Sequence, residues 1–71
     1  MNTETYSGQY RISIEVFGDI MRELEYKRLL DDSVYGSKAY DGNHNEVVTL
    51  FYDDVTEDVF DVICSHLDRS Y

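Results

Sequence analysis

The sequence lacks several features that define common classes of small protein. Its single cysteine excludes an internal disulfide and a zinc site built on paired cysteines. It has no proline, and no apolar run approaches the roughly 18 residues that a membrane span needs. The opening stretch, MNTETYSGQY, lacks the basic and apolar regions of a secretory signal. From these absences we expect a soluble, cytoplasmic protein.

Cations are scarce and unevenly distributed. The chain carries 15 Asp and Glu residues against 6 Lys and Arg residues, a formal net charge of -9. No Lys or Arg occurs from residue 39 to residue 68. Phosphate groups are repelled by such a surface, so direct binding to nucleic acid or to an anionic membrane is not expected. The asymmetry favours a basic protein partner.

With 71 residues, of which 42% are hydrophobic, the chain is long enough for one small domain with a core of its own. We predict a single domain over residues 1–71, with residues 1–8 flexible. Small domains bury little area, and pairing as a homodimer is one way to bury more.

Hydrophobic periodicity predicts the element order β-α-β-β-α, an α+β domain whose helices pack on an antiparallel sheet. Apolar and polar residues alternate over 10–16, which predicts a half-buried strand. Asp19 is the expected N-cap of a helix over 20–30, in which Glu23 and Lys27 form a favourable i, i+4 pair.

The second half of the sequence predicts a hairpin followed by a helix. Residues 33–40 read as a strand with a bulge at Gly36, and the turn sequence DGNHN (41–45) leads into a strand over 46–52. That strand is nearly apolar on both faces, as expected of a central strand covered on both sides or lying at a dimer contact. Asp54 is the expected N-cap of the final helix.

Catalytic and metal-binding patterns are weak. Asp41, Asn43 and Asn45 match the first positions of a calcium-binding EF-hand loop, but Glu46 stands where glycine is required. A metal site at Asp41, His44 and Glu46 remains an alternative, although no second histidine completes a known frame. A chain of this size has little room for an active-site pocket. We therefore expect no cofactor, no bound metal and no enzymatic activity.

The acidic segment FYDDVTEDVFD is the most distinctive feature. On a helix that starts at Asp54, the residues at offsets 3, 4, 7 and 14 lie on one face, and all four are acidic. Successive carboxylates are then spaced by about 5–6 Å along the axis, which resembles phosphate spacing in DNA. The expected partner-binding residues are Asp53, Asp54, Glu57, Asp58, Asp61 and Asp68, with Asp41 and Glu46 extending the negative field.

Two interpretations of this stripe remain open. Acidic residues keep a helix face soluble, and that explanation holds for most charge runs. The first predicted helix, however, mixes both signs, whereas the second has no cation before Arg69. The absence of stabilising i, i+4 pairs favours a surface that binds a basic partner.

In its small size, its predicted α+β fold and its acidity, the chain resembles the DNA-mimic proteins of bacteriophages. That group includes inhibitors of bacterial HU proteins, anti-restriction proteins and some anti-CRISPR proteins. The likeness rests on the stretch YDDVTEDVFD and on the cation-free span 39–68. It implies an inhibitor that occupies the DNA-binding surface of a host protein, with an HU-like nucleoid protein as the favoured partner.

The competing hypothesis is a protein-protein adaptor, or another anti-defence inhibitor, that binds through tyrosine and aliphatic side chains. Seven tyrosines in 71 residues is a high count, and tyrosine is favoured at interfaces. Tyr26, Tyr35, Tyr40 and Tyr52 are too many to lie in one small core, so we expect some of them on the surface.

Overall fold

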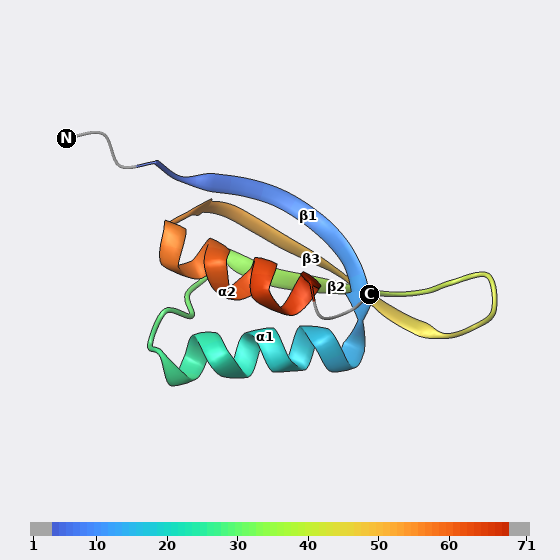
Figure 1. Cartoon of the computed structure of the whole chain (residues 1–71). Helices are drawn as coiled ribbons and strands as arrows, with labels where there is room; N and C mark the ends of the chain where they lie inside the picture. Colours follow the sequence, from blue (N-terminus) through green and yellow to red (C-terminus); the bar gives the residue numbers. More distant parts are fainter. Residues whose placement is uncertain (1–3, 69–71) are drawn as a thin grey trace.

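The computed structural model describes residues 4–68 as an antiparallel sheet with two helices packed on it (Figure 1). The elements in chain order are β1 (Tyr6–Ser13), α1 (Ile14–Tyr26), β2 (Val34–Tyr40), β3 (Glu46–Val55) and α2 (Glu57–Asp68). The predicted α+β class and the order β-α-β-β-α are confirmed. Among the described residues, no helix is long and apolar enough to cross a membrane.

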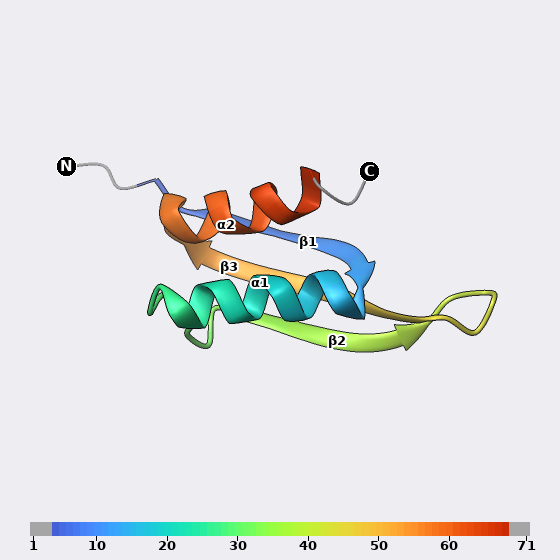
Figure 2. The same ribbon diagram turned by 60° about the horizontal axis from the view of Figure 1, so that its bottom comes forward.

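The three strands are ordered β1-β3-β2, so β3 is central and antiparallel to both neighbours. Both helices lie on the same side of the sheet (Figure 2). Alternate residues of β3, Val48, Leu50 and Tyr52, are buried beneath the helices, whereas Val47 and Phe51 point the other way and are half-buried. The expectation of a central strand is confirmed, but the helices cover only one of its two faces.

The core is a single apolar layer between the helices and the sheet. Four side chains have no exposed surface: Ile20 and Leu24 of α1, Leu50 of β3 and Ile63 of α2. Burying an aliphatic side chain of this size contributes roughly 1.5–3 kcal/mol relative to leaving it in water. The helical spacing of these residues therefore determines which face of each helix meets the sheet.

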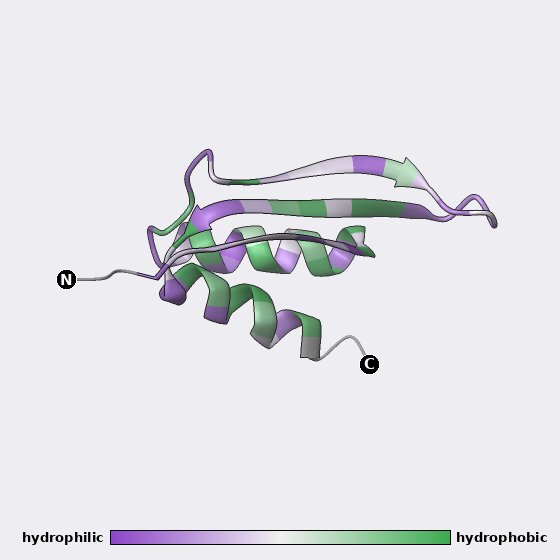
Figure 3. Ribbon diagram, turned by 90° about the horizontal axis from the view of Figure 1, so that it is seen from above, coloured by the Kyte–Doolittle hydropathy of each residue, from purple (hydrophilic) through white to green (hydrophobic). Residues whose placement is uncertain are grey.

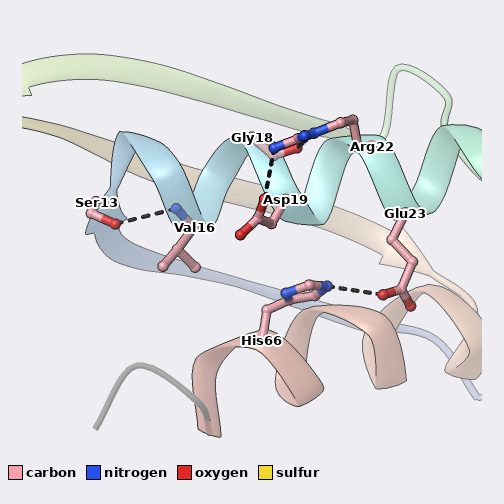
Figure 4. A network of polar contacts seen from close by, with 7 residues as sticks. All are labelled: Ser13, Val16, Gly18, Asp19, Arg22, Glu23 and His66. Carbon is pink, nitrogen blue, oxygen red and sulfur yellow. Dashed lines mark hydrogen bonds and ion pairs between the residues drawn. The ribbon is translucent and has the colours of Figure 1, made fainter.

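The boundary between the first strand and α1 differs from the prediction. β1 begins at Tyr6 and ends at Ser13, so it starts four residues earlier and ends three residues earlier than predicted. Residues 6–8 were expected to be flexible and instead form part of the sheet, while residues 1–3 lie outside the described residues. Ser13 is the N-cap of α1, and its Oγ accepts a hydrogen bond from the Val16 backbone N at 3.2 Å (Figure 4).

Asp19 is therefore not an N-cap. It lies inside α1, where its carboxylate pairs with Arg22 at 2.7 Å (Figure 4). The sequence was ambiguous because Val16 fits both the strand alternation and the helical series that continues through Phe17, Ile20 and Leu24. Packing of that series on the core decides in favour of the helix.

The C-terminal end of α1 also comes earlier than predicted, at Tyr26 instead of residue 30. Arg28 adopts the left-handed conformation with φ 58°, and its backbone N donates to the Glu25 carbonyl at 3.0 Å. The Leu29 backbone N donates to the Leu24 carbonyl at 2.8 Å. This pair of bonds is a Schellman motif, with arginine at the position that glycine usually occupies.

The irregularity in the sheet lies at a different place from the one predicted. Gly36 pairs regularly with Leu50, so β2 has no bulge there. The register shifts instead between β1 and the end of β3, where Ser7 stands opposite both Asp53 and Asp54. The extra residue of β3 returns Val55 to the helix side of the sheet, where it is buried. Its partner Tyr6 stacks on Phe60 with ring centroids 4.3 Å apart.

The predicted turn over 41–45 is confirmed. Asp41 Oδ1 accepts hydrogen bonds from the backbone N of Asn43 at 2.8 Å and of Asn45 at 2.9 Å. These two bonds lower the pKa of the Asp41 carboxyl, because they stabilise its charged form. The hairpin formed by β2 and β3 projects beyond the helices at this end of the molecule (Figure 1).

Candidate acidic interaction surface

The acidic segment is divided between the end of β3 and the start of α2. The helix begins at Glu57, and the Thr56 carbonyl accepts its first hydrogen bond, from the Phe60 backbone N at 3.0 Å. Asp54 is still part of β3 and has φ 51°, so the prediction that it caps α2 was wrong. The β-bulge is the physical reason, because it extends the pairing of β3 as far as Val55.

Three of the predicted carboxylates lie together on α2. Glu57, Asp58 and Asp61 are exposed, and the opposite face of the helix is buried through Val59 and Ile63. Glu57 and Asp58 occupy the first turn, where the positive end of the helix dipole stabilises negative charge. Glu57 and Asp61 are separated by about 6 Å along the helix axis.

The negative field of these side chains acts on their surroundings. Burial, together with the negative charges of Glu4, Glu57 and Asp61, raises the pKa of the Tyr6 hydroxyl above its usual range. Within residues 4–68, no ion pair joins a Lys or Arg to Glu57, Asp58 or Asp61. Their charge is therefore available to a partner.

A groove of about 470 Å³ separates α1 from α2 beside these carboxylates. Asp58 and Asp61 line one wall, and Lys27 and Glu23 of the α1 side line the other. Lys27 Nζ pairs with Glu23 Oε2 at 3.0 Å. One cation from the first half of the chain thus stands near the acidic residues, but a carboxylate of its own helix neutralises it.

Asp53 and Asp54 lie at the end of β3 beside the residues that precede and begin β1, and Asp54 Oδ1 accepts a hydrogen bond from Thr5 Oγ1 at 3.4 Å. Asp54 lines a smaller cavity of about 210 Å³ next to the start of α2, together with Arg28 and Asp31. Asp53 belongs to the strand residues that face away from the helices, and its Oδ1 accepts a hydrogen bond from Ser7 Oγ at 3.0 Å. We use the term acidic surface for the three exposed carboxylates of α2, which are Glu57, Asp58 and Asp61.

The other predicted site residues are not brought to the acidic surface. Asp41 lies in the hairpin turn and Glu46 pairs with Lys38 at 3.4 Å. Glu46 and Asp53 are seven positions apart along β3, about 23 Å at strand spacing. Asp68 ends α2, and its side chain lies outside the described part of the structure.

One polar contact between the helices was not predicted from the sequence. The His66 side chain is only 13% exposed, and its Nε2 lies 3.0 Å from Glu23 Oε1 (Figure 4). Glu23 thereby contacts both Lys27 and His66. The helical spacing of Glu23 and Lys27 was visible in the sequence, but no sequence signal joins Glu23 to His66 across 43 residues.

The alternative chemistry gains no geometric support in the described part of the chain. No group of three or more His, Cys, Asp or Glu side chains in residues 4–68 is arranged to hold a metal ion. The tyrosines divide as expected, since Tyr52 is buried while Tyr26, Tyr35 and Tyr40 are 87%, 54% and 72% exposed.

Comparison with known proteins finds no family model, no curated protein and no solved structure that matches this chain.

Proposed function

We propose that the protein is a non-enzymatic inhibitor that binds a basic DNA-binding protein in place of DNA. The observation that carries the proposal is the acidic surface, where Glu57, Asp58 and Asp61 are exposed without a Lys or Arg partner among residues 4–68. A fixed group of like charges attracts a basic groove at long range and competes with phosphates for it.

The rigidity of the surface supports this role. The carboxylates stand on a helix anchored by buried Val59, Val62 and Ile63, so binding does not first have to order the chain. Their spacing of about 6 Å over one helical turn is close to the distance between neighbouring phosphates on one strand.

The favoured partner is an HU-like nucleoid protein. Architectural proteins of this kind recognise the backbone charge and shape of DNA with few base-specific contacts. An acidic protein surface can imitate the backbone charge of DNA but has no base edges. It can therefore compete with DNA only for proteins that recognise the DNA backbone. The carboxylates Asp53, Asp41 and Glu46 lie elsewhere on the molecule, which limits the primary contact to the helix side.

Binding to a purified HU-like protein, measured by calorimetry at several salt concentrations, tests the proposal. We expect the affinity to fall about tenfold or more between 50 and 200 mM NaCl, because charged contacts dominate. The double variant Glu57→Lys/Asp61→Lys should lose most of the binding. The matched control Glu15→Lys/Glu25→Lys carries the same net charge but changes exposed residues of α1, and it should retain binding.

Equal loss of affinity in the two double variants would show that only overall charge matters and would contradict a defined acidic surface. Failure to bind HU-like proteins, together with salt-sensitive binding to another DNA-binding protein, would support DNA mimicry and contradict the choice of an HU-like partner.

A second candidate function is an adaptor, or another anti-defence inhibitor, that binds through tyrosine and aliphatic side chains. The observation in its favour is the exposure of Tyr26 and Tyr40. Such an interface predicts weak salt dependence, and loss of binding in Tyr26→Ala or Tyr40→Ala in place of the α2 charge reversals.

A further inference from the structure

The face of the sheet opposite the helices is uncovered in the single chain. Its centre is the ring pair Tyr35–Phe51, with centroids 5.1 Å apart and an interplanar angle of 16°. Tyr35 is 54% exposed, and Phe51 and Val47 of the central strand are only half-buried. Figure 3 shows hydrophobic residues along β3, and of these Val47 and Phe51 lie on the side away from the helices. We call this side of the three strands the open sheet face.

Charge on the open sheet face is sparse and symmetrically placed. Among the charged strand residues outside the bulge, register and alternation put Arg11 and Asp53 there. Arg11 pairs with Thr49, two residues before Phe51, and Asp53 lies two residues after it. The positive and the negative charge are therefore each about 7 Å along the strand direction from the aromatic pair, on opposite sides of it.

We infer that the open sheet face binds a second copy of the chain, packed sheet to sheet around a two-fold axis that crosses the strands at Phe51. This axis lies between the two sheets and runs perpendicular to the strands. Rotation about it reverses the strand direction and places β1 of one copy over β1 of the other. Each Arg11 then faces the Ser7–Asp53 pair of the other copy, and the two aromatic pairs meet at the axis. Packed sheets are separated by about 10 Å, a gap that a long arginine and an aspartate can span together.

Arg11 is available for this contact. Within residues 4–68 it forms no ion pair, although its positive charge contributes to lowering the pKa of Asp41 in the nearby turn. The acidic surface lies on the helix side of the sheet and stays exposed in the dimer. Dimerisation and partner binding are therefore independent properties.

The size of the open sheet face predicts a weak dimer. Three strands about 4.8 Å apart and eight residues long give a face of roughly 15 by 25 Å. The area is on the order of 400 Å² per partner, about half of a standard interface. The net charge of -9 on each copy opposes association further. We expect the dimer at high micromolar to millimolar concentration, and more of it when salt screens the repulsion.

Sedimentation velocity of the full chain, from about 10 µM to about 1 mM in roughly 0.15 M NaCl, tests the inference. The sedimentation coefficient should rise with concentration from that of a monomer toward that of a dimer. Tyr35→Ser should abolish the rise, and Tyr26→Ser, which removes an 87% exposed tyrosine from α1, should leave it unchanged. A monomer at every concentration, or a dimer insensitive to Tyr35→Ser, overturns the inference.

A charge swap tests the two-fold arrangement. Arg11→Asp and Asp53→Arg should each weaken the dimer about three- to tenfold, since each removes two symmetry-related pairs. The double variant Arg11→Asp/Asp53→Arg should recover most of the loss. Circular dichroism of each variant checks that the fold is intact. A double variant no better than either single variant contradicts the pairing of Arg11 with Asp53 across the interface.

Discussion

Gly36 illustrates how one residue type is required by a neighbour distant in the sequence. A Cβ atom at this position would lie 2.5 Å from Phe17 Cε1 and 2.7 Å from Val48 Cγ1. Phe17 of α1 thus packs directly on the backbone of β2. The glycine was read from the sequence as a bulge, whereas its role is to let a helix approach the sheet closely.

We predict that Gly36→Ala lowers the free energy of unfolding by about 1–3 kcal/mol, the usual cost of overpacking a core. Urea denaturation provides the measurement. Gly42→Ala is the control, because nothing lies within 4 Å of its Cβ position and its φ is not positive. That variant should change stability by less than about 1 kcal/mol. Similar losses in both variants would argue against the close packing of Phe17 on β2.

Among the elements, α1 begins after Ser13, which is its N-cap in place of the predicted Asp19. Ser13 accepts a hydrogen bond from the Val16 backbone N, whereas Asp19 makes only an exposed ion pair with Arg22. Ser13→Ala should therefore lower the free energy of unfolding by about 1 kcal/mol. Asp19→Ala should cost less than about 0.5 kcal/mol. Thermal unfolding of both variants compares them, and a larger loss for Asp19→Ala would contradict a helix that begins at Ile14.

The contact between α1 and α2 predicts a pH dependence of stability. Hydrogen bonds from Lys27 and His66 lower the pKa of Glu23 below its usual 4.5. The unfolded chain then takes up this proton at higher pH than the folded chain does. The stabilisation is present above about pH 4.5 and is lost as the pH falls through the pKa of the folded state.

Glu23→Gln should therefore flatten the fall in stability between about pH 6 and pH 3, and lower stability at neutral pH. Chemical denaturation at a series of pH values measures the slope. Glu25→Gln, which changes an exposed residue of the same helix, is the control and should leave the slope close to that of the wild type. An unchanged slope in Glu23→Gln would contradict a stabilising role for this contact.

At the scale of the whole molecule, self-repulsion follows from the net charge of -9. Salt screens this repulsion, with a Debye length of about 10 Å at 0.1 M. We predict that raising NaCl from about 10 to 300 mM increases the Tm by several degrees. The rise should be smaller in Glu57→Lys/Asp61→Lys, which has a net charge four units less negative. A Tm that falls with salt would indicate that ion pairs such as Arg22–Asp19 outweigh the repulsion.

The predictions that depend on residues close together in the sequence agree best with the structure. The hairpin turn follows from DGNHN alone, and Glu57, Asp58 and Asp61 share a face because helical periodicity requires it. Predictions failed where a contact between residues distant in the sequence decides the outcome. Asp53 and Asp54 were predicted to act with the helix carboxylates, but the pairing of β3 with β1 extends to Val55 and brings them beside Ser7 and Thr5.

The element order, a central strand that begins at Glu46 and the absence of Lys and Arg from residues 39–68 followed from the order of residues along the chain. Periodicity, turn chemistry and formal charge are properties of neighbouring residues, so they can be read along the chain. The start of α1, the contact of His66 with Glu23 and the uncovered face of the sheet became clear only in the three-dimensional structure. Those outcomes depend on which buried surfaces pack together, and packing compares residues that are far apart in sequence.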